Sequence, residues 1–363
     1  MKSHSPFTIH HSQKQFMTPT KAYAALSSKD LLIPFQFERR EVLPNDVQVE
    51  ILYCGVCHSD IHQVRDEWGE SIYPMVPGHE IVGNVIKVGS EVTKFKPGDI
   101  AGVGVMVDSC RTCKNCVRYM EQYCVEDMTG TYNAMERDGV TIAQGGYSSQ
   151  IVTDERYVYH ISSKLDLKAV APLLCAGITT YSPLRYAGVT EGMKVGVVGL
   201  GGLGHMGVKF SVSFGAEVTL ISTSPSKQKD AERLGAHKFL LSTNSKQMKK
   251  ADSYFDVILN TISARHHYKK YLNLLDLNGK MLVVGLPSED PKTSPFALIK
   301  NRRSITGSMI GGTKETQEML DYCAEKNIVA DVEVIPIQQI NEAYERMIKN
   351  DVRYRFVIDM KTL

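Results

Sequence analysis

The stretch Val195-Gly-Val-Val-Gly-Leu-Gly-Gly-Leu-Gly204 decides the fold of the second half of the chain. Its valine-rich start predicts a buried strand, and its glycines match the G-x-G-x-x-G pattern that leads a strand into a helix. The first glycine permits a tight turn, the second lets a pyrophosphate approach the backbone, and the third lets the helix pack on the strand. The N–H groups that begin the helix favour phosphate. We therefore predict a dinucleotide site at Gly199, Leu200, Gly201, Gly202, Leu203 and Gly204.

Strand-like runs alternate with helical stretches around this loop. Such an alternation predicts a doubly wound parallel sheet, here called the Rossmann domain. A purely structural glycine turn is the alternative interpretation of the loop, and the strand before it and the helix after it argue against that interpretation. The six runs are Val195–Val198, Glu217–Ser222, Lys238–Leu241, Phe255–Asn260, Lys280–Gly285 and Ser304–Gly307.

The end of the second run should decide which dinucleotide binds, because an NAD site places an acidic residue there. This chain has Ser222-Thr-Ser-Pro-Ser-Lys227 instead, and its first acidic residue is Asp230. Hydroxyl groups and a lysine suit the dianionic 2′-phosphate of NADP, which a carboxylate would repel. The alternative is that Lys227 is a solvated residue of the next helix. We predict NADP(H) held by Ser222, Thr223, Ser224 and Lys227.

The first half of the chain and its last part read differently from this domain. Short apolar runs such as Val47–Tyr53 and Ile81–Val88 are separated by Gly, Pro, Asn and Asp, which predicts a barrel-like β domain. A final strand at Tyr354–Ile358 is expected to return to it. The predicted fold is therefore a two-domain α/β chain: a disordered tail at 1–20, a β domain at 21–175 and 312–363, and the Rossmann domain at 176–311.

Two sets of metal-binding side chains occur in the first half of the chain. In one set, Cys110-x2-Cys113-x2-Cys116-x7-Cys124 offers four closely spaced thiols. Four thiolates with no free position predict a structural zinc. An iron–sulfur run of this kind normally ends with a gap of three residues and a proline, whereas Val125 follows here after a longer gap. A cluster or free thiols remain the alternatives.

The second set, Cys57, His79 and Cys175, is scattered along the chain. Two thiolates and one imidazole leave a fourth position free, which is typical of a catalytic zinc. Taken singly, a histidine is more often a satisfied core or surface residue, and a cysteine in an apolar run is more often a small buried hydrophobe. Beside a dinucleotide fold, the set predicts a zinc-dependent dehydrogenase. Asp60 is the expected carboxylate partner of His79.

Composition excludes several other classes of protein. A formal net charge of +2 gives no basic surface of the kind that nucleic acid requires. No apolar stretch reaches the length of a membrane span, and we expect no secretory signal. Of eight cysteines, six belong to the two metal sets, which leaves Cys54 and Cys323. Thiols reserved for metal favour a reducing compartment, so we expect a cytoplasmic enzyme.

Three stretches carry a resemblance to a known family: Gly55-Val-Cys-His-Ser-Asp-Ile-His62, Val76-Pro-Gly-His-Glu80 and Leu174-Cys-Ala-Gly-Ile-Thr179. Together with the four-cysteine motif, they resemble zinc-dependent medium-chain alcohol dehydrogenases, especially the cinnamyl alcohol dehydrogenase branch. The resemblance implies a GroES-like catalytic domain beside the Rossmann domain, two zinc ions per subunit and a homodimer. It also implies that Glu80 can approach the metal. The residues that it implies for the nicotinamide end of the cofactor are Thr179, Thr261, Gly285, Ser308, Met309 and Ile310.

These residues predict the reduction of an aldehyde, or the reverse oxidation of an alcohol. We expect Ser59, which stands where many members of the branch carry threonine, to pass a proton toward His62 and solvent. Trp68 is a candidate wall for aromatic or medium-chain substrates, with a core tryptophan as the alternative. The competing interpretations are an NAD-dependent polyol dehydrogenase, a zinc-free quinone reductase and a non-catalytic NADPH-binding protein.

Overall fold

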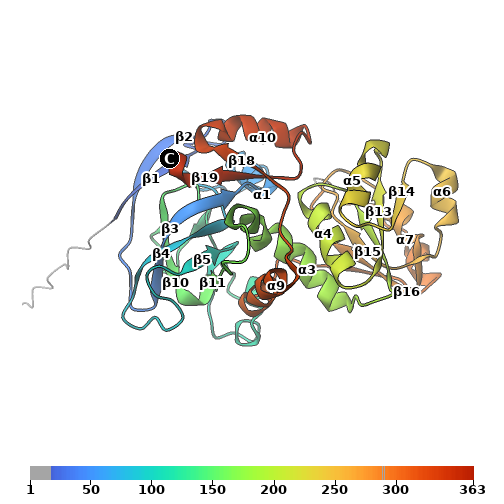
Figure 1. Cartoon of the computed structure of the whole chain (residues 1–363), viewed down its shortest axis with the longest axis horizontal. Coiled ribbons are helices and arrows are strands. Elements are labelled where there is room, and N and C mark those ends of the chain that lie inside the picture. Colours follow the sequence, from blue (N-terminus) through green and yellow to red (C-terminus); the bar gives the residue numbers. More distant parts are fainter. Residues whose placement is uncertain (1–17, 288, 290) are drawn as a thin grey trace, which may run out of the picture.

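The computed structural model describes residues 18–363 apart from 288 and 290. Figure 1 shows two bodies side by side along the long axis of the molecule. The β body holds the first strands and the C-terminal end of the chain, and the α/β body holds the strands β12 to β17 from the middle of the chain. The two-domain α/β organisation expected from the sequence is therefore present.

The α/β body contains one parallel sheet, in which the described residues form six strands in the order β14-β13-β12-β15-β16-β17. This order reverses beside the central strand β12, which is the arrangement of dinucleotide-binding sheets. The predicted doubly wound sheet is confirmed. The strands are β12 (Lys194–Val198), β13 (Glu217–Ser222), β14 (Lys238–Leu241), β15 (Phe255–Asn260), β16 (Leu275–Val283) and β17 (Ser304–Gly307).

Short helices connect these strands, and α4 begins inside the glycine loop at Gly202. Strand β16 starts five residues before the predicted run at Lys280, because Leu275 pairs with Phe255 across a bulge. The helices of this body are α4 (Gly202–Ser213), α5 (Gln228–Arg233), α6 (Ser245–Lys250), α7 (Tyr268–Leu272) and α8 (Pro295–Ile299).

The β body is a strongly curved sheet in the strand order β11-β5-β4-β3-β19-β18, with β10 also paired to β3. Strand β19 lies antiparallel to β3, so the C-terminal segment returns to this body as expected. The strands are β3 (Asp46–Gly55), β4 (Ile81–Val88), β5 (Ile100–Val103), β10 (Gln150–Asp154), β11 (Val158–His160), β18 (Val332–Pro336) and β19 (Arg355–Asp359). The helices that accompany it are α1 (His58–Val64), α2 (Leu167–Val170), α9 (Thr313–Lys326) and α10 (Ile340–Ile348).

The predicted tail at 1–20 is too long. Thr18, Pro19 and Thr20 form the start of β1 (Thr18–Ala24), which pairs with β2 (Ile33–Arg39). Residues 1–17 lie outside the described residues. The short strand pair β6 (Met106–Asp108) and β7 (Thr129–Gly130) flanks the segment that carries the four cysteines. A second short pair, β8 (Ala134–Met135) with β9 (Ile142–Ala143), follows it.

Helix α3 (Ala176–Ala187) lies between the two bodies (Figure 1). Ile178 of this helix belongs to one buried apolar cluster together with Val82 of the β body and Val197 of the α/β sheet. Tyr181 packs edge-on against Phe210 of α4 at 5.3 Å between ring centroids. Because one continuous core crosses the boundary, the start of α3 is held firmly in relation to both sheets. Among the described residues, no helix combines the length and the apolar character needed to cross a membrane.

The glycine loop gives a stability prediction. A Cβ atom at Gly204 would stand 2.1 Å from the carbonyl oxygen of Gly199, a backbone atom that cannot swing aside. We expect Gly204→Ala to lower the free energy of unfolding by about 1–3 kcal/mol, measured by urea denaturation. Gly201→Ala is the matched control, because no heavy atom lies within 4 Å of its Cβ position. Equal unfolding curves for the two variants would contradict the assignment of a close loop–helix contact to Gly204.

Candidate active site

The second predicted metal set is brought together at the starts of two helices and one strand. Cys57 directly precedes α1, His79 and Glu80 precede β4, and Cys175 directly precedes α3. One donor atom from each of the four residues lies within 4.8 Å of all the others. The sulfur atoms of Cys57 and Cys175 are 3.9 Å apart, although the residues are 118 positions apart in the chain. The folding of β3 onto β4 and the docking of α3 create this set.

Asp60 holds this set in place from one side. Its carboxylate is fully buried, and it accepts hydrogen bonds from the backbone N–H of Cys57 at 2.8 Å and of Gly78 at 3.2 Å. The Tyr147 hydroxyl donates to Oδ2 of Asp60 at 3.1 Å, and Nδ1 of His79 lies 3.2 Å from Oδ1 of Asp60. Asp60 thus fixes the ring of His79 and the backbone on both sides of the set. The partnership of Asp60 with His79 is the one expected from the sequence.

The charges of the set depend on one another. Burial alone would lower the pKa of His79, but the nearby carboxylate of Asp60 and thiol of Cys57 raise it well above its usual range. A hydrogen bond shared with Cys175 lowers the pKa of Cys57, and the same bond raises the pKa of Cys175. Burial raises the pKa of Glu80 to about 7, against the opposing effect of Arg355. The two thiols therefore shift each other's pKa in opposite directions.

The donor set fits a divalent metal. Two thiols and an imidazole are the ligands that zinc prefers when one position stays free. Oε2 of Glu80 is buried within the set and has no hydrogen-bond partner among the described residues. A buried carboxylate oxygen without a partner is costly unless a cation or a proton satisfies it. The residues present therefore suit zinc, with Glu80 close enough to exchange with another ligand.

The four cysteines of the other set also converge. The sulfur atoms of Cys110 and Cys116 are 3.8 Å apart, and those of Cys113 and Cys116 are 3.5 Å apart. The sulfur of Cys124 accepts a hydrogen bond from the backbone N–H of Cys110 at 3.4 Å. Backbone N–H groups of Val125 and Cys116 lower the pKa of Cys113 to about 6. This closed cage of four thiols matches the predicted structural zinc site.

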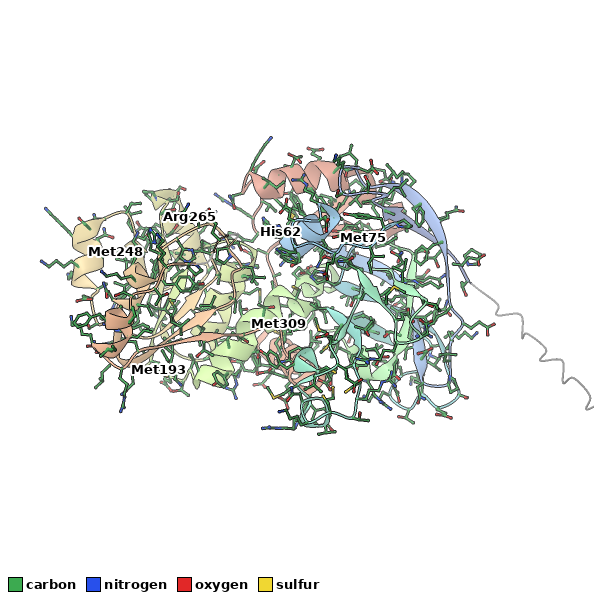
Figure 2. The ribbon with its side chains drawn as sticks, turned by 180° about the vertical axis from the view of Figure 1, so that it is seen from behind. His62, Met75, Met193, Met248, Arg265 and Met309 are labelled. Carbon is green, nitrogen blue, oxygen red and sulfur yellow. The ribbon has the colours of Figure 1, made fainter. Side chains whose placement is uncertain are left out.

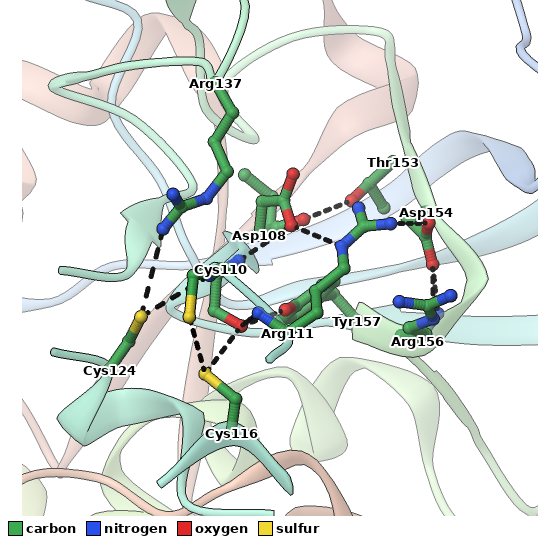
Figure 3. A network of polar contacts seen from close by, with 12 residues as sticks. Asp108, Cys110, Arg111, Cys116, Cys124, Arg137, Thr153, Asp154, Arg156 and Tyr157 are labelled. Carbon is green, nitrogen blue, oxygen red and sulfur yellow. Dashed lines mark hydrogen bonds and ion pairs between the residues drawn. The ribbon is translucent and has the colours of Figure 1, made fainter. Parts of the chain in front are cut away.

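Polar contacts tie this cage to the β body (Figure 3). The Arg111 guanidinium bridges Asp108 at 2.9 Å and Asp154, at the end of β10, at 3.0 Å. On the opposite side, the Arg137 guanidinium lies 4.0 Å from the sulfur of Cys124 (Figure 3). The segment is therefore joined to the body by charge as well as by the backbone.

The glycine loop lies at the carboxyl ends of the parallel strands. Gly199 has a φ of +93°, which glycine adopts without strain, and the hydroxyl of Thr261 after β15 donates to the carbonyl of Val198 at 2.8 Å. A Cβ atom at Gly285 would stand 2.3 Å from the carbonyl oxygen of Ile262. The predicted cofactor residues Gly199, Thr261 and Gly285 are thus at one edge of the sheet. This edge is where dinucleotides bind in such sheets.

The other predicted nicotinamide residues lie nearby in the fold. Thr179 is buried in the first turn of α3, and its N–H donates to the carbonyl of Cys175 at 2.9 Å. Ser308, Met309 and Ile310 follow β17, and the N–H of Ser308 donates to Val283 of β16 at 3.2 Å. Met309 lies where the two bodies meet (Figure 2).

The segment after β13 keeps its hydroxyl groups close together. The Ser222 hydroxyl accepts from the N–H of Ser224 at 3.2 Å, and the hydroxyls of Ser224 and Ser226 are 2.8 Å apart. Thr223 is exposed. The ammonium of Lys227 lies over the ring of Tyr354, 5.6 Å from its centroid. The carboxylate of Asp230 points elsewhere, since it pairs with Arg353 at 3.6 Å. No acidic side chain of the described residues therefore replaces the missing ribose carboxylate at 222–227.

The sequence analysis did not identify Arg355, which contacts both the set of Cys57, His79, Glu80 and Cys175 and the glycine loop. Its buried guanidinium forms an ion pair with Glu80 and donates to the carbonyl of Val56 at 2.8 Å. Its Cδ lies only 2.8 Å from the position of a Cβ at Gly202 in the glycine loop. Nε of Arg355 has no hydrogen-bond acceptor within the part of the chain that the structure describes, which suits an anion at the loop. The sole sequence signal was an arginine inside the apolar run Tyr354–Ile358.

The predicted proton-transfer residues are at the first turns of α1. The Ser59 hydroxyl lies 3.6 Å from the sulfur of Cys57. Nδ1 of His62 lies 2.5 Å from Oε2 of Glu67, and its ring stacks on Trp68 at 4.9 Å. Figure 2 places His62 near the boundary of the two bodies. No direct hydrogen bond joins Ser59 to His62 among residues 18–287, so a relay between them requires a bridging group.

Comparison with known proteins identifies the family. Residues 43–163 match the model of the alcohol dehydrogenase GroES-like domain, and residues 202–325 match that of the zinc-binding dehydrogenases. The aldehyde reductase YahK of Escherichia coli is 55% identical over 346 residues, which cover 94% of this chain and 99% of that protein. The chain belongs to the zinc-binding medium-chain alcohol dehydrogenase family. The predicted GroES-like domain and Rossmann domain are both confirmed.

Other members of the family show the same breadth of match. The NADP-dependent alcohol dehydrogenase C 1 of Mycolicibacterium smegmatis is 52% identical over 96% of this chain and 99% of its own length. Among solved structures, a cinnamyl alcohol dehydrogenase of Sorghum bicolor has a TM-score of 0.92 and 44% identity, covering 95% of this chain and 98% of that one. The CAD of Helicobacter pylori complexed with NADP(H) has a TM-score of 0.90 and 43% identity, with 95% and 99% covered.

The geometry of this alcohol dehydrogenase generates a prediction about metal retention. Asp60→Asn keeps the size of the side chain but removes the charge that faces His79 and two backbone N–H groups. We expect zinc at the Cys57 set to be held about 10- to 100-fold less tightly, measured by its release to a chromogenic chelator. Asp66→Asn, an exposed carboxylate just after the same helix, is the matched control. Identical release from Asp60→Asn and wild type would refute this role for Asp60.

Proposed function

We propose that this protein is a zinc- and NADP-dependent oxidoreductase that interconverts aromatic or medium-chain aldehydes and their alcohols. The observation that carries the proposal is the direct contact of Arg355 with both sites. A single guanidinium pairs with Glu80 in the donor set and packs against Gly202 in the glycine loop. A metal held by the donor set and a dinucleotide held by the loop would thus be neighbours. That arrangement is what hydride transfer to a polarised carbonyl requires.

We further propose two zinc ions per chain. Cys57, His79 and Cys175 would hold the catalytic ion, and Cys110, Cys113, Cys116 and Cys124 would hold the structural ion. When bound, zinc supplies a Lewis acid for the carbonyl oxygen and NADPH supplies the hydride. Asp60 keeps the imidazole of His79 in the orientation that a ligand needs. Glu80 offers an additional oxygen on the side that faces Arg355.

The proposed proton path uses the first turns of α1. The Ser59 hydroxyl lies 3.6 Å from the sulfur of Cys57, where it would donate a proton to the substrate oxygen during aldehyde reduction. His62 is about one turn further along the helix and is paired with the exposed carboxylate of Glu67, so it can exchange that proton with solvent. Ser59 would be the end of this path at the donor set, and His62 would be the end that reaches solvent.

The proposed preference for NADP rests on the segment 222–227. Its serine hydroxyls and the Lys227 ammonium are free of any carboxylate partner in the described part of the chain. Most of the hydrogen-bonding capacity of a 2′-phosphate can be met by such donors. The family supports the same conclusion, because several relatives are named as NADP-dependent alcohol dehydrogenases and one solved relative is complexed with NADP(H).

The substrate class is proposed from the walls of the site. Tyr132 is buried and its ring stacks on His79 at 5.7 Å, and Trp68 is 45% exposed and stacks on His62. The tryptophan is therefore not a core residue. Aromatic walls favour apolar substrates over polyols. A polyol is the second candidate, because relatives from Fragaria ananassa and Petroselinum crispum, 51% and 53% identical, are named as a probable mannitol dehydrogenase and a mannitol dehydrogenase.

We also propose an oligomeric state and a cellular compartment for the enzyme. The side chains of Leu286, after β16, and of Phe296 and Ile299 in α8 are strongly exposed. Such an apolar group suits the interface of a homodimer. All eight cysteines are free thiols, which supports a reducing compartment such as the cytoplasm.

The proposal is tested by initial rates of NADPH oxidation with cinnamaldehyde, with NADH in parallel. We expect faster turnover with NADPH, and we expect Lys227→Ala to raise the KM for NADPH by about 10-fold without a comparable change for NADH. Lys229→Ala, an exposed lysine in the next helix, is the matched control.

The substrate class is tested by assaying mannitol with NADP⁺ beside the aldehyde. Faster oxidation of mannitol would favour the polyol candidate, and NADPH binding without any turnover would favour a non-catalytic protein.

The proton path is tested at His62. We expect His62→Ala to lower kcat by about 100-fold, at the lower end of general acid–base effects, with little change in the KM for aldehyde. His62→Phe is the informative companion, because it retains a flat ring to stack on Trp68 but cannot exchange a proton. A loss in both variants supports proton transfer. Near wild-type turnover in His62→Phe would show that His62 acts through packing alone.

A further inference from the structure

We propose that the four-cysteine lobe, residues 110–124, is a clamp that positions the nicotinamide wall of the cofactor site. Tyr123 and Glu121 are the positioning residues of this clamp. The wall is the segment Ser308–Ile310 after β17, so the inference rests on the proposed function. The lobe thereby gains a role in cofactor binding beyond the stability that a closed metal cage provides.

Two side chains of the lobe contact the wall segment or the residues just after it. The Tyr123 hydroxyl accepts a hydrogen bond from the backbone N–H of Met309 at 3.1 Å. The buried carboxylate of Glu121 accepts from the N–H of Thr313 at 3.0 Å and from its hydroxyl at 2.9 Å. Helix α9 begins at Thr313 after Gly312, which has no side chain to cap it. The lobe therefore supplies the cap, and it fixes the segment 309–313 at both ends.

The backbones of the lobe and the segment also touch. A Cβ atom at Gly312 would stand 1.7 Å from the carbonyl oxygen of Tyr119, a distance that no side chain tolerates. Tyr119 itself has a φ of +58°, in the left-handed region, which turns its carbonyl group toward Gly312. A glycine is required here because two backbones approach each other. The contact leaves the segment little room to shift relative to the lobe.

Ile310 is the strained point within the clamped segment. Its φ of +38° lies in the left-handed region, which a β-branched residue rarely adopts. Strain of this kind persists when the surrounding structure over-determines it, and it occurs often at ligand sites. Tyr123 holds the residue before Ile310, and Glu121 holds the third residue after it. The clamp thus accounts for a conformation that the segment would not adopt alone.

The positions of the two clamp residues connect them to the metal cage. Glu121 and Tyr123 form one 3₁₀ turn between the third and fourth cysteines, Cys116 and Cys124. Because the lobe has little other regular structure, the four sulfur atoms define the backbone path of this turn. Pre-ordering the wall in this way reduces the conformational entropy lost when the cofactor binds. Loosening the clamp should therefore weaken binding of the nicotinamide end and leave the adenosine end unaffected.

The test compares Tyr123→Phe and Glu121→Gln with wild type in the metal-loaded full chain. Tyr119→Phe is the matched control, since within the described residues its hydroxyl makes no hydrogen bond while its backbone contact is kept. Binding is measured by NADPH fluorescence and by titration with 2′,5′-ADP, a fragment without nicotinamide. We expect the Kd for NADPH to rise about 3- to 10-fold in each clamp variant, in line with the loss of one hydrogen bond in Tyr123→Phe and of a charged acceptor in Glu121→Gln. The Kd for 2′,5′-ADP and the zinc content should not change.

Each other outcome overturns the clamp in a recognisable way. Wild-type NADPH affinity in both variants would show that the contacts do not position the wall. Equal weakening of NADPH and 2′,5′-ADP would show a general structural effect, as would the same weakening in Tyr119→Phe. A wild-type protein that binds 2′,5′-ADP but gains nothing from the nicotinamide, or that does not bind NADPH, would overturn the proposed function together with the clamp.

Discussion

The buried guanidinium of Arg355 is the contact on which the arrangement of the two sites depends. A charge in the interior is costly unless other groups neutralise it and satisfy its hydrogen bonds. Burial acts to lower the pKa of Arg355, but Glu80 and the thiols of Cys57 and Cys175 raise it above its usual range. The cation is therefore stable in the interior only while the anionic donor set stands beside it. Because β19 carries Arg355 and pairs with β3, the C-terminal return of the chain is also part of the site.

A second constraint is the number of groups that converge on Asp60. One carboxylate orders the backbone at Cys57, the backbone at Gly78 and the ring of His79. These groups lie at the ends of different elements, which otherwise have no reason to hold a common geometry. Satisfying a buried carboxylate demands several donors, and here the donors are the parts that must be aligned for metal binding. The hydrogen-bonding need of one buried carboxylate thus aligns Cys57 and His79 within the set.

The sequence alone predicted the structure correctly where a local pattern allows only one conformation. The turn at the glycine loop could be predicted, because the backbone has a positive φ at Gly199 and packs closely at Gly204, and both positions require glycine. The pairing of Asp60 with His79 followed from the chemistry of the residues. The role of Arg355 did not follow, because its partners in the chain are 275 and 299 positions away and depend on the register of β19. The contacts of Glu121 and Tyr123 were likewise hidden, since the spacing of cysteines says nothing about which way the residues between them point.

The geometry of the two cysteine sets favours a different role for each. In one set, Glu80 has an oxygen without a hydrogen-bond partner among the described residues, and one donor atom from each of the four residues lies within 4.8 Å of the others. In the other set, four sulfurs close on one another, and the residues between them bond outward to Met309 and Thr313. A closed cage cannot bind a substrate, but it can hold a short irregular loop as firmly as a hydrophobic core would. A loop of this kind is useful beside a cofactor, where rigidity is needed and a packed core would fill the space that the cofactor occupies. Under the proposed function, the open set would hold the catalytic zinc, and the closed cage would hold the segment that lines the cofactor site.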